Sequence, residues 1–292
     1  MAEIAGVLTA MVTPFTDDGS LDEAAARKLA RHLIENGSHG VVVAGTTGES
    51  PTLSDEEDMV LVRAVRDELG DGPLVVCGTG TNDTHHSERL SAAAADNGAD
   101  AVLVVTPYYN KPNRAGILAH YEAVCRAAGI PVIAYNIPSR VVLNIPPDLL
   151  AELGEIENLV AVKQANNDEI DQVKGLEVLA GNDDIFLRCL ESGGVGGILV
   201  ASHIVGNEMR EIYDAMQSGD SDRAAETDRR IHPIFEAMAL DTNPIPVKAA
   251  AEMLGLIPSA RMRLPMVEAD ESTRGELRKA LEAQGLLTAS AA

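Results

Sequence analysis

The sequence predicts a protein of the α/β class, a (β/α)8 TIM barrel followed by a small C-terminal all-helical region. Eight short runs rich in β-branched residues alternate with Ala-rich amphipathic segments, at the spacing of βα units. Hydrophobic residues make up 46% of the chain and aromatic residues only 3%, so the expected core is aliphatic. Such a core is typical of parallel strands that helices cover on both faces. A doubly wound open sheet is the less favoured alternative.

The expected strands are the eight apolar runs, each bounded by turn residues. A chain of 292 residues suits one barrel of about 250 residues with an appendage better than two equal domains. The runs are Val7–Val12, Gly40–Ala44, Leu74–Cys77, Ala101–Val105, Val132–Tyr135, Leu159–Lys163, Glu177–Ala180 and Gly197–Val200.

Capping residues mark the expected helices between these strands. Ser54–Glu57 reads as a capping box, and Asn113 and Asn167 are suited to N-cap positions. Asn36-Gly37 and Lys174-Gly175 are expected to end helices, because glycine accepts the left-handed backbone that commonly follows a helix.

The strand pattern stops after Gly219, and three further helices are expected. They cover Asp222–Leu240, Ile245–Leu254 and Glu271–Ala283, the second of them introduced by the prolines of Asn243–Pro246. The predicted division is a catalytic barrel over residues 1–218 and a helical region over residues 219–292.

Charge and composition exclude several classes of function. The formal net charge of −22 argues against nucleic-acid binding, which requires a surface rich in Lys and Arg. The acidity favours solubility and leaves room for small anionic substrates beside a local cation. No apolar stretch reaches the length of a membrane span, and the N-terminus does not resemble a signal peptide. Three widely spaced cysteines suit a reducing compartment, so we expect a cytoplasmic protein.

An amine and two hydroxyls are expected to meet at one end of the barrel. Lys163 and Tyr135 close the sixth and fifth expected strands, and Thr46 follows the second. Because the C-terminal ends of barrel strands share one face, these side chains converge there. Burial lowers the pKa of a lysine and makes it a nucleophile, and paired hydroxyls can relay protons. Alone, either residue has a structural explanation, but their joint placement favours imine chemistry on a keto acid.

Other sequence signals point to no metal and no cofactor. His85-His86 are neighbours that do not share a helix face, and the remaining histidines are scattered. Gly78-Thr79-Gly80 lacks the third glycine and the acidic residue of a dinucleotide-binding motif. Gly193–Gly197 precedes the last strand and predicts a tight turn rather than a phosphate cradle.

Several motifs carry a resemblance to a known family. They are Gly45-Thr46-Thr47-Gly48-Glu49-Ser50, Thr106-Pro107-Tyr108-Tyr109-Asn110, Tyr135-Asn136-Ile137-Pro138-Ser139-Arg140, Val162-Lys163 and Asn243-Pro244-Ile245-Pro246-Val247-Lys248. Their order and spacing, from Met11 to Met266, resemble those of the dihydrodipicolinate synthase family of class I pyruvate-dependent aldolases. The resemblance implies a lyase of lysine and diaminopimelate biosynthesis that condenses pyruvate with L-aspartate 4-semialdehyde.

The resemblance also implies a role for each site residue. Lys163 would form the Schiff base with pyruvate, and Tyr135, Thr46 and Tyr109 would form the proton relay. Tyr109 would enter the site of a neighbouring subunit, which implies a homo-oligomer, usually a dimer of dimers. The substrate-binding residues would be those that hold carboxylates or line the pocket. Thr46 and Thr47 would hold the pyruvate carboxylate, Arg140 the semialdehyde carboxylate, and Gly181 and Ile198 would line the pocket.

Two departures from the family pattern bear on regulation and catalysis. In relatives that lysine inhibits, histidines on the helix after the Gly-Thr-Thr-Gly-Glu motif and a nearby carboxylate contact the effector. In this chain the stretch Ser50–Asp58 carries acidic residues in place of those histidines, and His86 takes the place of the carboxylate, so we expect weak or absent inhibition by lysine. Gln164 stands where many relatives carry Glu, and strand alternation is expected to point it out of the barrel.

Two alternative functions stay open at this point. N-acetylneuraminate lyases and 2-keto-3-deoxy-sugar-acid aldolases share the barrel, the lysine and the tyrosine, but sialic acid lyases commonly show Ser-Thr where this chain has Thr46-Thr47. That pair, together with Arg140 and Tyr108-Tyr109, favours the semialdehyde as second substrate. A catalytically silent barrel that binds a keto acid is the non-enzymatic alternative.

Overall fold

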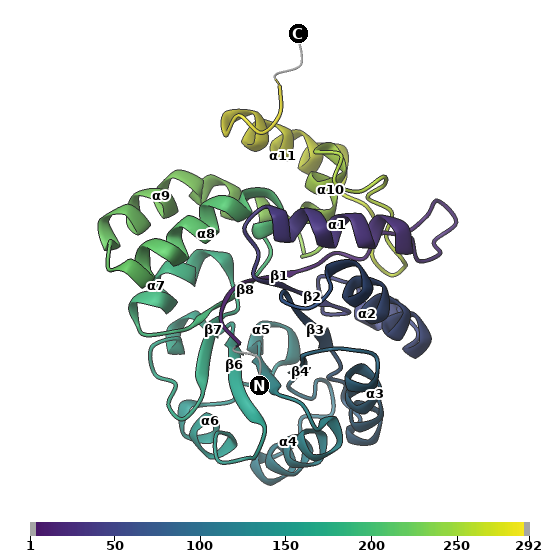
Figure 1. Ribbon diagram of the computed structural model, residues 1–292, viewed down its shortest axis with the longest axis vertical. Helices are drawn as coiled ribbons and strands as arrows, with labels where there is room; N and C mark the ends of the chain where they lie inside the picture. Colours follow the sequence, from purple (N-terminus) through teal and green to yellow (C-terminus); the bar gives the residue numbers. More distant parts are fainter. Residues whose placement is uncertain (1–3, 289–292) are drawn as a thin grey trace.

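The computed structural model describes residues 4–288 and contains a closed barrel of eight parallel strands in sequence order (Figure 1). Each strand pairs with its neighbours, and β1 pairs with β8 to close the sheet. The strands are β1 (Gly6–Ala10), β2 (Gly40–Val43), β3 (Leu74–Gly78), β4 (Ala101–Val105), β5 (Val132–Asn136), β6 (Leu159–Gln164), β7 (Glu177–Ala180) and β8 (Gly196–Leu199). The predicted barrel is confirmed, with every strand end within two residues of its predicted place.

Helices surround the barrel and extend beyond it (Figure 1). The α-helices are α1 (Glu23–Glu35), α2 (Asp55–Leu69), α3 (Thr84–Asp96), α4 (Arg114–Ala128), α5 (Pro138–Val141), α6 (Pro147–Leu153), α7 (Phe186–Glu191), α8 (Ser202–Ser218), α9 (Ser221–Met238), α10 (Ile245–Met253) and α11 (Glu271–Ala283). Short 3₁₀ turns occupy η1 (Ser50–Thr52), η2 (Asn167–Glu169) and η3 (Asp183–Ile185).

Most predicted caps are present. Ser54 and Glu57 form the capping box of α2, and the Asn113 side chain caps α4 by accepting from the Gly116 N–H. Asn36 ends α1, and Gly37 follows with a φ of +103°. These caps could be predicted because each depends on only a few neighbouring residues.

The prediction of a helix between Asn167 and Lys174-Gly175 is wrong. The chain after β6 forms only the η2 turn, and Asn166 rather than Asn167 accepts a backbone N–H at its start. This connection spans residues 165–176, and Ile170 is its one fully buried apolar side chain. A helix this short, with only Ile170 and Val173 to pack against the core, does not recover the free energy needed to form its first turn.

Strand alternation sorts the core into two layers. Ile133 and Tyr135 belong to the hydrophobic cluster inside the barrel, whereas Val132 and Ala134 pack between the strands and the helices. The same alternation on β6 places Ala161 inside and Val162 outside. It therefore directs the Lys163 side chain inward.

The C-terminal helices pack on one side of the barrel (Figure 1). Helix α9 lies along α8, and α10 contacts α8, α9 and α11. The predicted helices are confirmed to within two residues, and the bounds of α11 are as predicted. The proposed boundary between residues 218 and 219 stays a prediction. No helix in residues 4–288 is long and apolar enough to cross a membrane.

Candidate active site

Lys163 and Tyr135 lie next to each other on neighbouring strands. They are paired residues in the parallel register of β5 and β6. The Lys163 Nζ atom lies 4.3 Å from the centroid of the Tyr135 ring. Residues paired in this way are about 5 Å apart and point to the same face. The barrel therefore brings the predicted nucleophile and the predicted acid–base group together.

A cavity of about 520 Å³ opens onto this pair. Its lining includes Lys163 and Tyr135, as well as the predicted substrate-binding residues Thr47, Arg140 and Gly181. Ile198, predicted as a lining residue, is instead completely buried on β8 in the cluster inside the barrel, and it is not part of the cavity wall. The volume suits a small molecule.

The environment of Lys163 favours a neutral amine. The side chain is 5% exposed, and burial lowers the pKa of Lys163 to about 7. The charge of Asp183 opposes this shift, and the charge of Arg140 adds to it. A neutral ε-amine has a free lone pair, so a substantial fraction of Lys163 is nucleophilic near neutral pH.

Asp183 is a site residue that sequence reasoning missed. It belongs to the η3 turn after β7 and lines the cavity with Lys163. Its carboxylate accepts hydrogen bonds from the Val200 and Ala201 N–H groups at 2.9 to 3.1 Å. Burial raises the pKa of Asp183 to about 6, while these N–H groups and Lys163 oppose the shift. Asp183 therefore supplies negative charge close to the amine.

Tyr135 keeps its proton throughout the neutral pH range. Burial raises the pKa of Tyr135 to about 12, and the nearby Arg140 charge opposes this shift. A neutral phenol can accept one proton while it donates another. The environment therefore suits a relay in which no charge has to rest on the phenol.

Thr46 and Thr47 lie in the loop after β2, and their environments differ. Thr46 is half-buried and lines a second cavity together with Tyr135. Among residues 4–288, no hydrogen bond joins the Thr46 hydroxyl to that of Tyr135. Thr47 is buried, lines the Lys163 cavity and accepts a hydrogen bond of 3.0 Å from the Asn243 side chain.

Arg140 and Asn243 form the outer wall of the cavity. The Arg140 guanidinium donates to the backbone carbonyl of Asn243 at 2.9 Å. The Asn243 amide donates to Thr47, while its Oδ1 atom is buried without a hydrogen-bond partner among the described residues. Asn243 therefore joins Arg140 and Thr47 at this wall of the cavity. The sequence motif at Asn243 marked a helix start and did not reveal this contact.

Tyr109 stands apart from the other predicted site residues. It follows β4, is 87% exposed and has a φ of +72°. It lines neither cavity within this chain. A large aromatic side chain held outward in this way is available to a second molecule.

The second cavity, of about 470 Å³, lies on the other side of Tyr135 and Arg140. Both residues line both cavities. Its wall includes Asp55, Asp58 and His86, and the Asp55 carboxylate lies 2.8 Å from the His86 ring nitrogen. Asp58 is buried, its Oδ1 atom has no partner among the described residues, and burial raises the pKa of Asp58 to about 8.

Comparison with known proteins gives a consistent result. The profile of the dihydrodipicolinate synthetase family matches residues 3–284. A protein of Moorella thermoacetica named 4-hydroxy-tetrahydrodipicolinate synthase is 43% identical over 96% of this chain and 98% of its own. Dihydrodipicolinate synthase of Acinetobacter baumannii, solved with pyruvate, is 35% identical over 98% of this chain and 100% of its own, with a TM-score of 0.94. The Cyanidioschyzon merolae enzyme, solved with lysine bound, is 37% identical over 97% of this chain and 99% of its own, with a TM-score of 0.92.

Proposed function

This chain belongs to the dihydrodipicolinate synthetase family, and from that premise we propose a mechanism in which Lys163 carries the condensation of pyruvate with L-aspartate 4-semialdehyde. The product is 4-hydroxy-tetrahydrodipicolinate, and the reaction is of the class I aldolase type. The observation that carries the proposal is the buried Lys163 amine 4.3 Å from the Tyr135 ring, at the wall of a cavity for a small molecule.

The chemical steps follow from a neutral amine in a sheltered site. The Lys163 nitrogen attacks the ketone carbon of pyruvate, and loss of water from the carbinolamine gives the imine. Removal of a methyl proton then gives an enamine, whose terminal carbon forms a bond to the aldehyde carbon of the second substrate. The amino group of the adduct attacks the imine carbon and closes the ring, which frees Lys163 for another turnover.

Proton transfer accompanies most of these steps. Tyr135 lies beside the amine and stays a neutral phenol, so it can donate to the leaving hydroxyl and accept from the nitrogen. Thr46 and Tyr109 complete the proposed relay, with Tyr109 acting in the neighbouring subunit. The outward placement of Tyr109 supports an enzyme that works as a homo-oligomer.

The two substrate carboxylates have separate proposed binding groups. Thr46 and Thr47 hold the pyruvate carboxylate, and Thr47 is already oriented by Asn243. Arg140 stands at the outer wall, where its planar guanidinium can bind the semialdehyde carboxylate through two parallel hydrogen bonds. Gly181 completes the wall of the cavity.

A comparison of substrates tests this function. The purified protein should consume pyruvate only when L-aspartate 4-semialdehyde is present, and it should not cleave N-acetylneuraminate. Reduction with borohydride in the presence of pyruvate should add the mass of the reduced adduct to the Lys163 peptide. Cleavage of N-acetylneuraminate without condensation would assign the site to a sialic acid lyase, and an unmodified Lys163 peptide would support the silent keto-acid-binding barrel.

The pH dependence of turnover follows from the Lys163 pKa. Below about 7 the amine is increasingly protonated and cannot attack a ketone, so kcat/KM for pyruvate should fall about tenfold per pH unit there. Above about 7 the amine is neutral and the profile should become flat. Steady-state rates across this range measure the inflection. An inflection near 10.5, the value of an ordinary lysine, would contradict the sheltered amine.

Inhibition by L-lysine is expected to be weak or absent. The Asp55 carboxylate in the second cavity is paired with His86, and below about pH 8 Asp58 is mostly protonated, so neither offers a free charge to the lysine ammonium. Turnover measured with millimolar L-lysine at pH 7 and pH 8 checks this expectation. Strong inhibition at pH 7 would show that these replacements do not remove the effector site.

A further inference from the structure

Glu49 ends the loop that carries Thr46 and Thr47, and its own backbone is in an unfavourable conformation. Its φ of +58° and ψ of +35° lie in the left-handed region, where a residue with a side chain rarely sits. The loop is closed by bonds from the Glu49 N–H to the Thr46 carbonyl and from the Ser50 N–H to the Gly45 carbonyl, at 3.1 and 3.2 Å. The position of Thr46 therefore depends on how Glu49 is held.

The Glu49 side chain is held entirely by the C-terminal region. Only 3% of the residue is exposed. One carboxylate oxygen accepts from the Lys248 Nζ at 2.5 Å, and the other accepts from the Arg263 backbone N–H at 3.1 Å. Lys248 lies on α10, and Arg263 lies in the segment between α10 and α11. Two groups more than 190 residues away in the chain thus fix one loop residue.

Lys248 and Arg263 both contact an aromatic ring from the opposite end of the chain. The Lys248 Nζ lies 4.2 Å from the centroid of Phe15, and the Arg263 guanidinium carbon lies 4.4 Å from it. Lys248 and Phe15 are both fully buried. A cation that contacts an aromatic ring and a carboxylate has little freedom to move. The cluster of Glu49, Lys248, Phe15 and Arg263 is called the loop anchor below.

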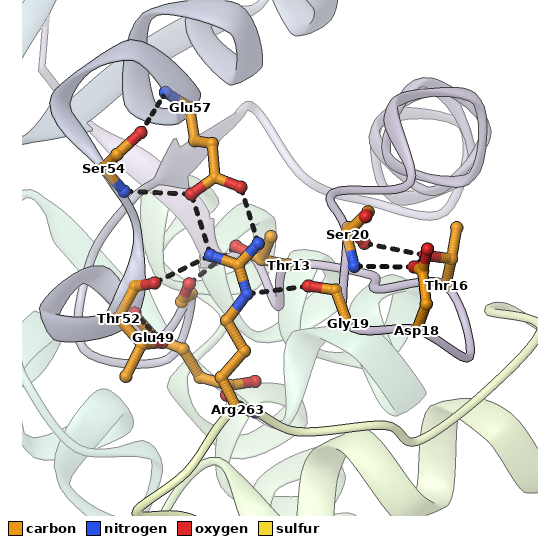
Figure 2. A network of polar contacts seen from close by, with 11 residues as sticks. Thr13, Thr16, Asp18, Gly19, Ser20, Glu49, Thr52, Ser54, Glu57 and Arg263 are labelled. Carbon is orange, nitrogen blue, oxygen red and sulfur yellow. Dashed lines mark hydrogen bonds and ion pairs between the residues drawn. The ribbon is translucent and has the colours of Figure 1, made fainter.

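Arg263 extends the loop anchor to the start of α2. Figure 2 shows its guanidinium between Glu57, Thr52 and Gly19. It donates to both Glu57 carboxylate oxygens, at 2.5 and 2.8 Å, and to the Thr52 and Gly19 carbonyls, at 2.7 and 2.9 Å. These contacts lower the pKa of the Glu57 carboxyl below its usual range. The segment that follows Glu49 is thus held at both ends.

Stability alone does not explain a buried pair of this kind. Removing two charges from water costs about as much as their attraction returns, and apolar residues of similar size often do as well. A charged pair nevertheless specifies one geometry, because both carboxylate oxygens accept hydrogen bonds only when the side chain has one orientation. At Glu49 that orientation coincides with the strained backbone that closes the Thr46 loop.

We propose that Glu49 and Lys248 are positioning residues that hold the Thr46–Thr47 loop in its pyruvate-binding geometry, so that the C-terminal helices are part of the active site. The inference rests on the proposed function, since it assigns the pyruvate carboxylate to that loop. Neither side chain lines the Lys163 cavity, so both act through the loop.

The test compares Glu49→Gln, Lys248→Met and the double variant. Each is assayed for KM and kcat with pyruvate, for melting temperature and for labelling of Lys163 by pyruvate and borohydride. We expect kcat/KM for pyruvate to fall roughly 10- to 100-fold, chiefly through KM, because a displaced loop binds the carboxylate poorly. The double variant should recover melting temperature relative to Lys248→Met, because it leaves no unpaired buried charge, but it should not recover KM.

Glu252→Gln is the matched control. Glu252 also lies on α10, accepts from a backbone N–H (Ala260, 2.9 Å) with one oxygen and binds a cation (Arg274, 2.6 Å) with the other. It should lose stability and keep the wild-type KM. A folded double variant with the wild-type KM, or an equal change in Glu252→Gln, would overturn the proposal. Failure of the wild-type protein to label at Lys163 would instead refute the proposed function.

Discussion

Lys163→Met is expected to lower turnover by roughly 10⁴-fold or more, the scale seen when an enzyme loses its nucleophile. No other lysine of the described chain lines the cavity with Tyr135, so no second amine can form the imine. Turnover of pyruvate with L-aspartate 4-semialdehyde measures the loss. Mass spectrometry after reduction with borohydride should find no pyruvate adduct on the variant. Lys174→Met, which removes an exposed lysine, is the control and should keep the wild-type rate.

Lys163→Met is also expected to stabilise the fold. The Lys163 pKa is about 7 in the native state and about 10.5 in the unfolded chain, so between these values the unfolded chain binds a proton that the native state lacks. Native stability is therefore lost as pH falls from 10.5 toward 7. At pH 8 the loss is on the order of 3 kcal/mol, which methionine avoids.

Denaturant unfolding of the wild-type and Lys163→Met proteins at pH 8 and near pH 10.5 checks the direction of this stability change. The Lys163→Met protein should be more stable at pH 8, and the difference should shrink near pH 10.5. An adduct on another lysine, or residual turnover near the wild-type rate, would remove Lys163 from its role. If the wild-type and Lys163→Met proteins were equally stable at pH 8 and again near pH 10.5, the Lys163 amine would not be sheltered from solvent.

The barrel and the Lys163–Tyr135 pair could be predicted from sequence because both depend on local pattern. The apolar runs gave the strands, and a residue at the end of a run lies at the end of its strand. Two such residues on consecutive strands face the same cavity whenever their alternation agrees, as Ile133–Tyr135 and Ala161–Lys163 do. The resemblance to a family added substrates and roles that the pattern alone does not contain.

The rest of the site depends on contacts between distant segments, which no local pattern reveals. Asp183 faces Lys163 only because the η3 turn folds its carboxylate onto the N–H groups after β8. Asn243 reaches Thr47 from a helix start 196 residues away. Ile198 was predicted at the cavity wall and is buried instead, since a strand position fixes the face of a side chain but not its depth in the barrel.

Tyr135→Phe is expected to slow turnover by about 10²- to 10⁴-fold while the fold is kept, the range for loss of a positioned acid–base group. Phenylalanine keeps the ring that packs beside the Lys163 amine, and the Tyr135 hydroxyl makes no hydrogen bond within residues 4–288. The variant should therefore still form the pyruvate adduct, more slowly, because the amine is intact and only proton transfer is impaired.

Tyr121→Phe is the matched control for this prediction. Tyr121 is also buried, but its hydroxyl donates to the Val104 carbonyl at 3.0 Å and the residue lies outside both cavities. Its loss should cost about 1 kcal/mol of stability and leave kcat unchanged. Single-turnover trapping and steady-state rates of both variants separate the two roles. If Tyr135→Phe and Tyr121→Phe were equally active, the phenol would be a packing residue and the protons would have to move through Thr46, Asp183 or water.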